Sequence, residues 1–368
     1  MIALALVDAP EHVCCRYRIR AFAPALEASG WSLQIESLQP SSISRLLQYR
    51  RAAQFGTVIL QRKLLPKWQL RELRRRCSHL VFDFDDAVLY RDSYNVRGPL
   101  SSRRADRFAR VVQMADTVIA GNDFLADCAL RAGARPDQVR VIPTCIETER
   151  YVPAWRRPQT DGAGIELVWI GSSSTLQGLE QQKPLWERLA RAVPGVRLRL
   201  ICDRFPNLGS MAVREVAWSE ATEAAELAAG DVGIAWMPDD VWSRGKCGLK
   251  VLQYQAAGLP VIANPVGVHL EMVEPGISGF LAETPEEWQE AARTLARDSD
   301  LRRRMGREAR VAVELGYSVS AWAPTFVAAI AGRRPVPPPK FESLRQRMPR
   351  SPRHATPTEG GGEARSRF

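Results

Sequence analysis

The sequence predicts an α/β fold in which two Rossmann-like domains follow one another and a disordered tail comes last. Short apolar runs alternate with helical periodicity from the first residues, which is the pattern of parallel sheets. The alternation stops at Pro153–Gly164, which has two prolines and two glycines, and then restarts. The 368 residues suffice for two domains with a core each. We therefore expect a first domain at 1–152, a linker at 153–164, a second domain at 165–332 and a tail at 333–368.

Each domain is expected to contain six strands, recognised as short apolar runs. In the first domain they are Ile2–Val7, Ser32–Ile35, Thr57–Leu60, Leu80–Phe82, Thr117–Ala120 and Arg140–Ile142. In the second domain they are Glu166–Ile170, Arg197–Ile201, Arg214–Ala217, Val232–Trp236, Pro260–Ile262 and Gly279–Leu281.

Amphipathic stretches between these runs predict helices. The first domain has them at Ile19–Ser29, Gln69–Cys77, Arg103–Met114 and Asp123–Ala132. The second has them at Leu179–Ala192, Glu220–Ala229, Lys246–Ala257, Pro285–Arg297 and Asp300–Leu315. A last helix at 318–330 is expected to pack back toward the first domain. Tandem βα domains place a cleft between the carboxyl ends of their strands, where ligands of open α/β sheets bind.

Composition and charge restrict the class of protein. No run approaches the ~18 apolar residues of a membrane span, and Met1–Asp8 lacks the basic start of a signal peptide, so we expect a cytoplasmic protein. Seven scattered cysteines indicate reduced packing residues, and four histidines offer little for a metal site. The net charge is +10, of which the tail carries +6. This tail, rich in Pro, Arg, Ser and Gly, should be disordered.

The segment from Arg244 to Gly258 has the features of a diphosphate site. Gly245 and Gly248 allow a ligand to approach the backbone, and the helix that follows presents free N–H groups to an anion. Arg244, Lys246 and Lys250 add positive charge. An ordinary loop and helix with solvated basic residues would show the same spacing, because short glycine motifs have false positives.

This segment resembles the donor signature of the group 1 (family four) retaining glycosyltransferases of the GT-B fold. In that family Glu-Gly-x-Gly-x-x-x-x-Glu precedes Ala-x-Gly-x-Pro-Val; here the two Glu positions hold Gly245 and Gln253. Similar motifs at Val141–Pro153, Val261–Ala282 and Cys15–Gly30 extend the resemblance over about residues 1–330.

The resemblance implies the GT-B architecture, no cofactor and no metal, and transfer with retention of configuration. Gln253 would then bond a ribose hydroxyl, while the missing first Glu affects the choice of sugar. Where the family carries cations on the donor diphosphate, this chain has Gly171, Ser172 and Ser173. The remaining residues expected at the donor are Arg244, Lys246, Gly248, Leu249 and Lys250, with Arg204 in reserve. Arg16, Tyr17 and Arg18 are expected on the acceptor side.

Three carboxylates, Asp83, Asp85 and Asp86, follow one another at the end of a strand. Carboxylates in a cleft are costly unless paired or functional. Asp83-Phe84-Asp85 could be the metal-binding DxD of a different glycosyltransferase class. In the family that the chain resembles, Asp85 or Asp86 would instead be catalytic, orienting the acceptor or stabilising oxocarbenium charge. The alternative is helix capping or pairing with Arg91.

The segment Arg45–Arg76 carries ten basic residues against the single acid Glu72. Leu64, Leu65 and Trp68 are interleaved with them, as in a face that lies on an anionic membrane. A solvated helix face with a core stripe is an equal alternative. Nucleic acid is not expected as a partner, because no recognition fold accompanies the charge.

Together these patterns predict an enzyme that moves a hexose-like sugar from a nucleoside-diphosphate sugar to a glycan or lipid-linked acceptor. It would work in the cytoplasm or on the inner face of the cell membrane. The alternative is a non-catalytic binding or scaffold protein of the same fold, which the residues at the two Glu positions, Gly245 and Gln253, suggest.

Overall fold

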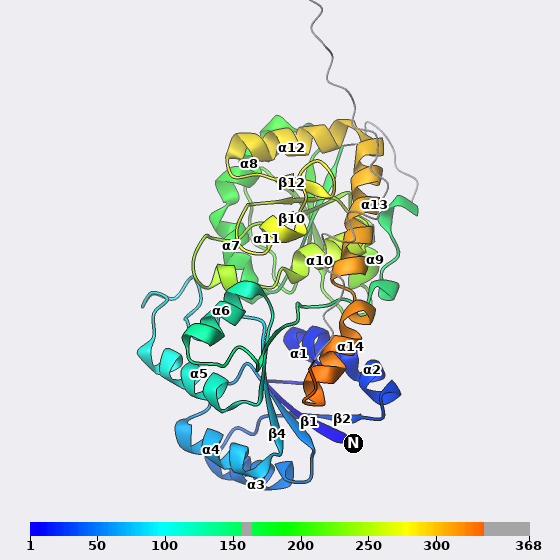
Figure 1. Cartoon of the computed structure of the whole chain (residues 1–368). Coiled ribbons are helices and arrows are strands. Elements are labelled where there is room, and N and C mark those ends of the chain that lie inside the picture. Colours follow the sequence, from blue (N-terminus) through cyan, green and yellow to red (C-terminus); the bar gives the residue numbers. More distant parts are fainter. Residues whose placement is uncertain (157–163, 335–368) are drawn as a thin grey trace, which may run out of the picture. The chain divides into compact units, whose positions relative to one another are not determined.

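A computed structural model of the chain describes residues 1–156 and 164–334 and shows two parallel six-stranded sheets (Figure 1). The first has the order β2-β1-β3-β4-β5-β6 and the second the order β12-β11-β10-β7-β8-β9. The first sheet consists of β1 (Ile2–Val7), β2 (Ser32–Ser37), β3 (Thr57–Gln61), β4 (His79–Phe84), β5 (Thr117–Ala120) and β6 (Val139–Val141). The second consists of β7 (Glu166–Ile170), β8 (Arg197–Cys202), β9 (Ala212–Ala217), β10 (Val232–Ala235), β11 (Val261–Ala263) and β12 (Gly279–Leu281).

Helices connect the strands of each sheet. The first half contains α1 (Val13–Arg18), α2 (Ala23–Ala28), α3 (Ser42–Ala52), α4 (Lys67–Arg76), α5 (Ser102–Met114) and α6 (Asp123–Arg131). The second half contains α7 (Leu176–Gln181), α8 (Lys183–Ala192), α9 (Glu223–Ala228), α10 (Leu249–Ala256), α11 (His269–Met272), α12 (Pro285–Arg297), α13 (Ser299–Gly316) and α14 (Val319–Ile330). The α/β class with two Rossmann-like sheets is confirmed. The expected disordered tail and most of the expected linker lie outside the described residues.

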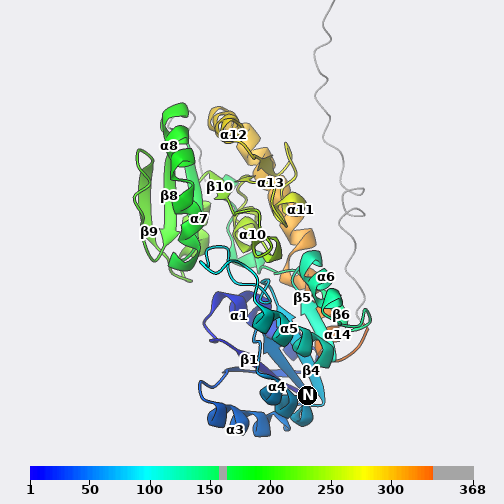
Figure 2. The same cartoon turned by 90° about the vertical axis from the view of Figure 1, so that its left-hand side faces the viewer.

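The two faces of the first sheet are covered by different helices. Alternate strand residues such as Leu4, Leu60 and Phe82 pack with α3, α4, α5 and α6. Figure 2 shows α3, α4 and α5 together on this side. The intervening residues pack with α1, α2 and α14. Both faces are therefore buried, as in other parallel sheets.

Helix α14 returns the chain to the first sheet. Phe326 stacks on Phe22 with ring centroids 4.2 Å apart. Thr57 donates a hydrogen bond from Oγ1 to the carbonyl of Ile330 at 2.9 Å. Residues at the end of the chain's second half thus complete the core of its first half.

Glycines allow α10 and α13 to pack closely in the second half. A Cβ atom on Gly306 would lie 2.1 Å from the carbonyl oxygen of Gly258, so any larger residue would force the helices apart. On the other side of the sheet Trp186 of α8 meets Trp288 of α12 edge to face, with centroids 5.7 Å apart. The close helix contact fixes the end of α10, whose beginning belongs to the candidate site.

Several expected helices differ from the observed ones for local reasons. Ile19–Ser29 is not one helix: α1 begins earlier, and a new helix starts around Pro24, which suits a first turn. Leu179–Ala192 is likewise two helices, with Pro184 at the start of α8. The helix expected from Lys246 begins at Leu249, because Gly248 is left-handed (φ 63°). Helices α3 and α11 were not predicted; α3 has a weak apolar pattern.

Candidate functional site

Residues after β4 and β5 of the first sheet meet the segment Ser243–Gly248 of the second half. A Cβ atom on Gly245 would lie 2.6 Å from Cβ of Ala87, and one on Gly121 would lie 2.4 Å from Sγ of Cys247. Only glycine fits at either position in this arrangement. The first Glu of the family pattern is therefore replaced by Gly245 at a point where the loop after β4 fills the space of a side chain.

Asn122 joins the same two segments. Its Nδ2 donates to the carbonyl of Lys246 at 3.0 Å, while its Oδ1 accepts from the amide of Leu125 at 2.9 Å and caps α6. The sequence signal for this residue is its place two positions after the predicted strand Thr117–Ala120, at the carboxyl end of the sheet. One buried amide therefore fixes the backbone beside Lys246.

Of the three carboxylates, Asp83 is structural. It is inaccessible to solvent, and its Oδ1 pairs with Nη2 of Arg18 at 2.5 Å. Arg18 is also buried and donates from Nη1 to the carbonyl of Ile142 at 2.6 Å. The guanidinium of Arg18 is buried, and its nitrogens bond to Asp83 and to the carbonyl of Ile142. Its position therefore does not support the expected acceptor-side role.

Asp85 and Asp86 lie nearer to the second half. Arg62, at the end of β3, contacts both carboxylates, with Nε 3.5 Å from Oδ1 of Asp85. Lys246 reaches across with Nζ 2.8 Å from Oδ1 of Asp86. Burial acts to raise the pKa of Asp85, but the charges of Arg62 and Arg18 outweigh it, so this pKa is lowered. The carboxylate is ionised at neutral pH, and its buried Oδ1 has no hydrogen-bond partner among the described residues.

Arg62 holds its place through an unusual backbone conformation. Its φ is 59°, and no other non-glycine residue in the described part of the chain has a positive φ. Such a conformation costs energy outside glycine and tends to persist at functional sites. No sequence pattern indicated it, although Arg62 follows a predicted strand.

The start of α10 supplies the other side of the site. Gly248 caps the helix in the left-handed conformation, and Lys250 lies in its first turn. The Lys250 Nζ is 4.9 Å from the centre of the Trp169 ring and 3.4 Å from Oγ1 of Thr175. Burial, together with the charge of Lys246, lowers the pKa of Lys250 to about 8. Lys246 and Lys250 are thus the cations beside the helix N-terminus, where anions bind.

Two other cations expected at the donor point elsewhere. Arg244 is exposed and pairs with Asp239 at 2.8 Å, and Arg204 is exposed and pairs with Glu180 at 2.9 Å. The partner of Arg244 is near in the sequence, and the partner of Arg204 is near in space. The hydroxyl loop after β7 is organised locally as well, since the amide and hydroxyl of Ser173 both bond Asp203. Ser172 caps this turn through Thr175.

Gln253 is buried against the first half of the chain. Its Nε2 donates to the hydroxyl of Tyr17 at 3.1 Å, and this hydroxyl donates to Oε1 of Glu223 at 3.1 Å. Arg16 pairs with the same Glu223 at 2.6 Å. The structure therefore brings Tyr17, Arg16 and Gln253 together. Their polar groups, however, bond to one another and to Glu223. Glu223 and Tyr151, whose hydroxyl is 3.1 Å from that of Tyr17, were not predicted.

The comparisons with known proteins agree with this layout. Residues 241–312 match the family described as glycosyl transferases group 1. Within these residues the chain is similar to the group 1 glycosyltransferases. Its helix α10, with Gly248 and Lys250, lies inside the matched region.

Curated relatives of the chain are named D-inositol 3-phosphate glycosyltransferase. The protein of Saccharomonospora viridis is 28% identical over 225 residues, 55% of this chain and 52% of its own length. That of Acidothermus cellulolyticus is 26% identical over 305 residues, 75% of this chain and 62% of its own length. The chain thus matches about half to three fifths of these relatives.

Solved structures show the same GT-B fold over most of the chain's length. Sucrose-phosphate synthase from Thermosynechococcus elongatus has a TM-score of 0.70 at 17% identity, covering 88% of this chain and 96% of that one. Anabaena HepE in complex with UDP and glucose has a TM-score of 0.61 at 17% identity, covering 90% and 99%.

Two features of the described residues bear on the alternatives raised from the sequence. No helix within 1–156 and 164–334 has the length and apolar character to cross a membrane. In the same residues no three His, Cys, Asp or Glu side chains are grouped so that they could hold a metal ion. In the DxD sequence Asp83-Phe84-Asp85, the first carboxylate pairs with Arg18 and the second with Arg62.

Proposed function

We propose that the chain transfers a hexose-like sugar from a nucleoside diphosphate to a hydroxyl group of a glycan or lipid-linked acceptor. The observation that carries this proposal is the meeting of two groups of opposite charge. The helix start with Lys246 and Lys250 faces the ionised Asp85 and its neighbour Asp86 across the two halves of the chain. A sugar nucleotide has the matching polarity, because its diphosphate is anionic and its anomeric carbon becomes positive in the transition state.

In this proposal α10 and the two lysines bind the diphosphate. Free N–H groups at the start of α10 and the charge of Lys250 would hold its oxygens. Lys246 would exchange Asp86 for the diphosphate, since its side chain is about one third exposed and can turn. The leaving group would then be stabilised as negative charge develops on it.

The carboxylates would act on the sugar side. Asp85 has an oxygen without a hydrogen bond and a lowered pKa, so it can stabilise positive charge at the anomeric carbon. Asp86, released by Lys246, could orient an acceptor hydroxyl. Retention of configuration, the absence of a metal and the absence of a cofactor rest on the family resemblance and stay predictions.

The nature of the donor is suggested by relatives. HepE was solved with UDP-glucose, and a lipopolysaccharide outer core galactosyltransferase, WaaB, shares the fold with a TM-score of 0.61. We therefore propose UDP-glucose and related UDP-hexoses as the first donors to test.

A binding protein without turnover is the second candidate. It is favoured by Gly245, whose place leaves no room for a carboxylate, and by Gln253, which Tyr17 and Glu223 hold. Such a protein would bind the donor but would not cleave it. The two candidates therefore differ in turnover alone.

The test combines binding with turnover on the whole chain. Melting temperature is measured with UDP, GDP and ADP, and release of glucose from the corresponding sugar nucleotides is followed over time. We expect a rise in melting temperature with one nucleotide and slow donor hydrolysis that EDTA does not affect. Binding without hydrolysis or transfer would favour the binding protein, and no binding to any of the three would overturn both candidates.

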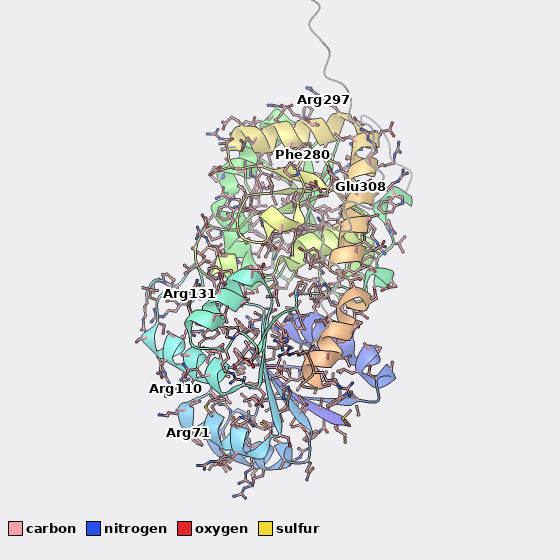
Figure 3. The ribbon with its side chains drawn as sticks, viewed as in Figure 1. Arg71, Arg110, Arg131, Phe280, Arg297 and Glu308 are labelled. Carbon is pink, nitrogen blue, oxygen red and sulfur yellow. The ribbon has the colours of Figure 1, made fainter. Side chains whose placement is uncertain are left out.

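We also propose that the basic face of the first half contacts an anionic membrane. Helices α3 and α4 lie side by side, joined by a bond of 3.2 Å from Arg45 to Gln69. Apolar side chains are exposed among the arginines: Ile43 at 76%, Leu47 at 57% and Trp68 at 50%. Arg71 of α4 and Arg110 of α5 extend from the same side of the sheet (Figure 3). Exposed apolar groups with basic neighbours are typical of helices that lie in the membrane interface.

Co-sedimentation with vesicles containing phosphatidylserine tests this face. The structure selects Arg50, Arg71 and Arg75, because Arg74 pairs with Asp116 and Arg76 with Glu72. The triple change to Ala should reduce binding by at least tenfold at low salt, since each basic residue contributes about 1 kcal/mol. The matched control changes Arg297, Arg304 and Arg307 of α12 and α13 to Ala. An equal loss in both triple variants would contradict a specific face.

A further inference from the structure

A groove lies between the loop that follows β4 and helix α7, outside the site described above. Its volume is about 550 Å³, within the range of about 300–1,000 Å³ for small-molecule sites. The side chains that line it are all polar: Ser93, Tyr94, Asn95, Gln177, Glu180 and Gln181. We call it the Tyr94 groove. A groove of this size lined by polar side chains suits a ligand that carries many hydrogen-bonding groups.

Three of the lining side chains, Gln177, Gln181 and Tyr94, are free to bind such a ligand. Within the part of the chain that the structure describes, the side-chain amides of Gln177 and Gln181 make no hydrogen bond, and neither does the Tyr94 hydroxyl. Burial and the charges of Asp240 and Asp92 raise the pKa of Tyr94 to about 12, so its hydroxyl stays protonated and can donate. Amides and a phenol offer both donors and acceptors, as sugar hydroxyls require.

The charges around the groove disfavour an anionic ligand. Glu180 is the ionisable acid of the lining, and it already engages Arg204 at 2.9 Å. Asp92 and Asp240 lie close enough to Tyr94 to raise its pKa. No lysine or arginine lines the groove in the described residues. A phosphate would therefore meet carboxylates and no free cation.

The groove is connected to the donor segment. Oγ of Ser93 is 3.2 Å from Oγ of Ser243, which begins the turn Ser243–Gly245 before Lys246. Lys246 in turn pairs with Asp86. A ligand in the Tyr94 groove would thus lie beside the segment that leads to the reacting groups.

We infer that the Tyr94 groove is a subsite for the acceptor and selects an uncharged, polyhydroxylated sugar over a phosphorylated one. This inference rests on the proposed function, because it takes the ligand to be an acceptor. Gln177, Gln181 and Asn95 bond its hydroxyls, and the ring of Tyr94 offers a flat face to its C–H groups. The carboxylates Glu180, Asp92 and Asp240 keep phosphorylated sugars out.

Saturation-transfer NMR on the full chain with UDP tests this subsite. The probes are the methyl α-glycosides of glucose, galactose and mannose, with glucose 6-phosphate as the charged counterpart. We expect at least one methyl glycoside to bind, and glucose 6-phosphate to leave its signal unchanged. Changing Gln177 and Gln181 together to Ala should reduce the signal at least fivefold. Both residues are exposed helix positions that accept Ala, and Gln54→Ala, away from the groove, should have no effect.

Each other outcome overturns the inference. These are the absence of binding by any of the three glycosides, binding that survives in the double variant, and displacement by glucose 6-phosphate. The same samples are assayed for the UDP melting shift and for donor hydrolysis, which the double variant should retain. If those two fail in the wild type, the proposed function falls. If they succeed while glycoside binding fails, the subsite alone is wrong.

Discussion

The two halves of the candidate site satisfy their charges in different ways. In the first half, Asp83 and Arg18 form a pair that is sealed from solvent, and Arg62 contacts both Asp85 and Asp86. In the second half, Lys250 has a ring and a hydroxyl as neighbours and no carboxylate among the described residues. The acidic half is therefore organised before a ligand binds, whereas Lys250 of the second half has no acidic partner in the described residues until an anion binds.

The sealed pair offers the strongest test of this comparison. Arg18→Met would leave Asp83 as a buried charge without its partner, which costs about 3–5 kcal/mol of unfolding free energy. Urea unfolding followed by circular dichroism measures it. Arg110→Met, which breaks an exposed pair with Asp106 on α5, should cost no more than about 0.5 kcal/mol. Equal costs for the two variants would show that the first half is not preorganised by the buried pair.

Asp85→Asn should give the next largest effect. The change keeps the shape of the side chain but removes its charge. The rate of sugar transfer or donor hydrolysis should therefore fall about 100-fold, the usual effect of removing one group that stabilises charge in a transition state. UDP affinity should change less than twofold, because Asp85 faces the sugar side. Asp106→Asn is the exposed control. A parallel loss of UDP binding would mean that Asp85 acts on the ground state or on folding.

Gln253→Glu would restore the acidic residue of the family pattern and should nevertheless destabilise the protein. The new carboxylate would be buried beside Tyr17 and close to Glu223, so we expect a loss of about 1–3 kcal/mol. The loss should shrink at acidic pH as the new group takes up a proton. Thermal melts at pH 5 and pH 8 measure it, with Gln289→Glu on α12 as control. A more stable variant would refute the assigned role of Tyr17 and Glu223.

The smallest expected effect concerns pH. The pKa of Lys250 is lowered to about 8, so the side chain is mostly charged at pH 7 and mostly neutral at pH 9. Its attraction for a diphosphate is thus present below pH 8 and lost above it, and UDP affinity should fall severalfold between pH 7 and pH 9. Lys250→Arg stays charged over this range and should show a flat profile. A flat wild-type profile would exclude Lys250 from the diphosphate site.

The sequence predicted the fold well and the site in part. Strands with strong apolar runs, such as Ile2–Val7 and Glu166–Ile170, were placed correctly. Helix starts depended on local details, and Gly248 moved the start of α10 by three residues.

In the site, Asp86 and Lys246 form an ion pair that the sequence did not predict. Which cation is available could not be predicted, because Asp239 captures Arg244 and Glu180 captures Arg204 through side-chain positions. The left-handed Arg62 and the contact of Gly245 with Ala87 are likewise consequences of packing.

Calorimetric titration with UDP tests the central claim most directly, because it compares Lys246 with Arg244 in one segment. The claim is that the diphosphate is bound by Lys246 and the start of α10. Lys246→Ala should weaken UDP binding at least tenfold, the scale of one charge-assisted hydrogen bond of about 1.5–3 kcal/mol. Arg244→Ala, whose side chain pairs with Asp239 at the surface, should change it less than twofold. The reverse order, or equal small effects, would contradict the account.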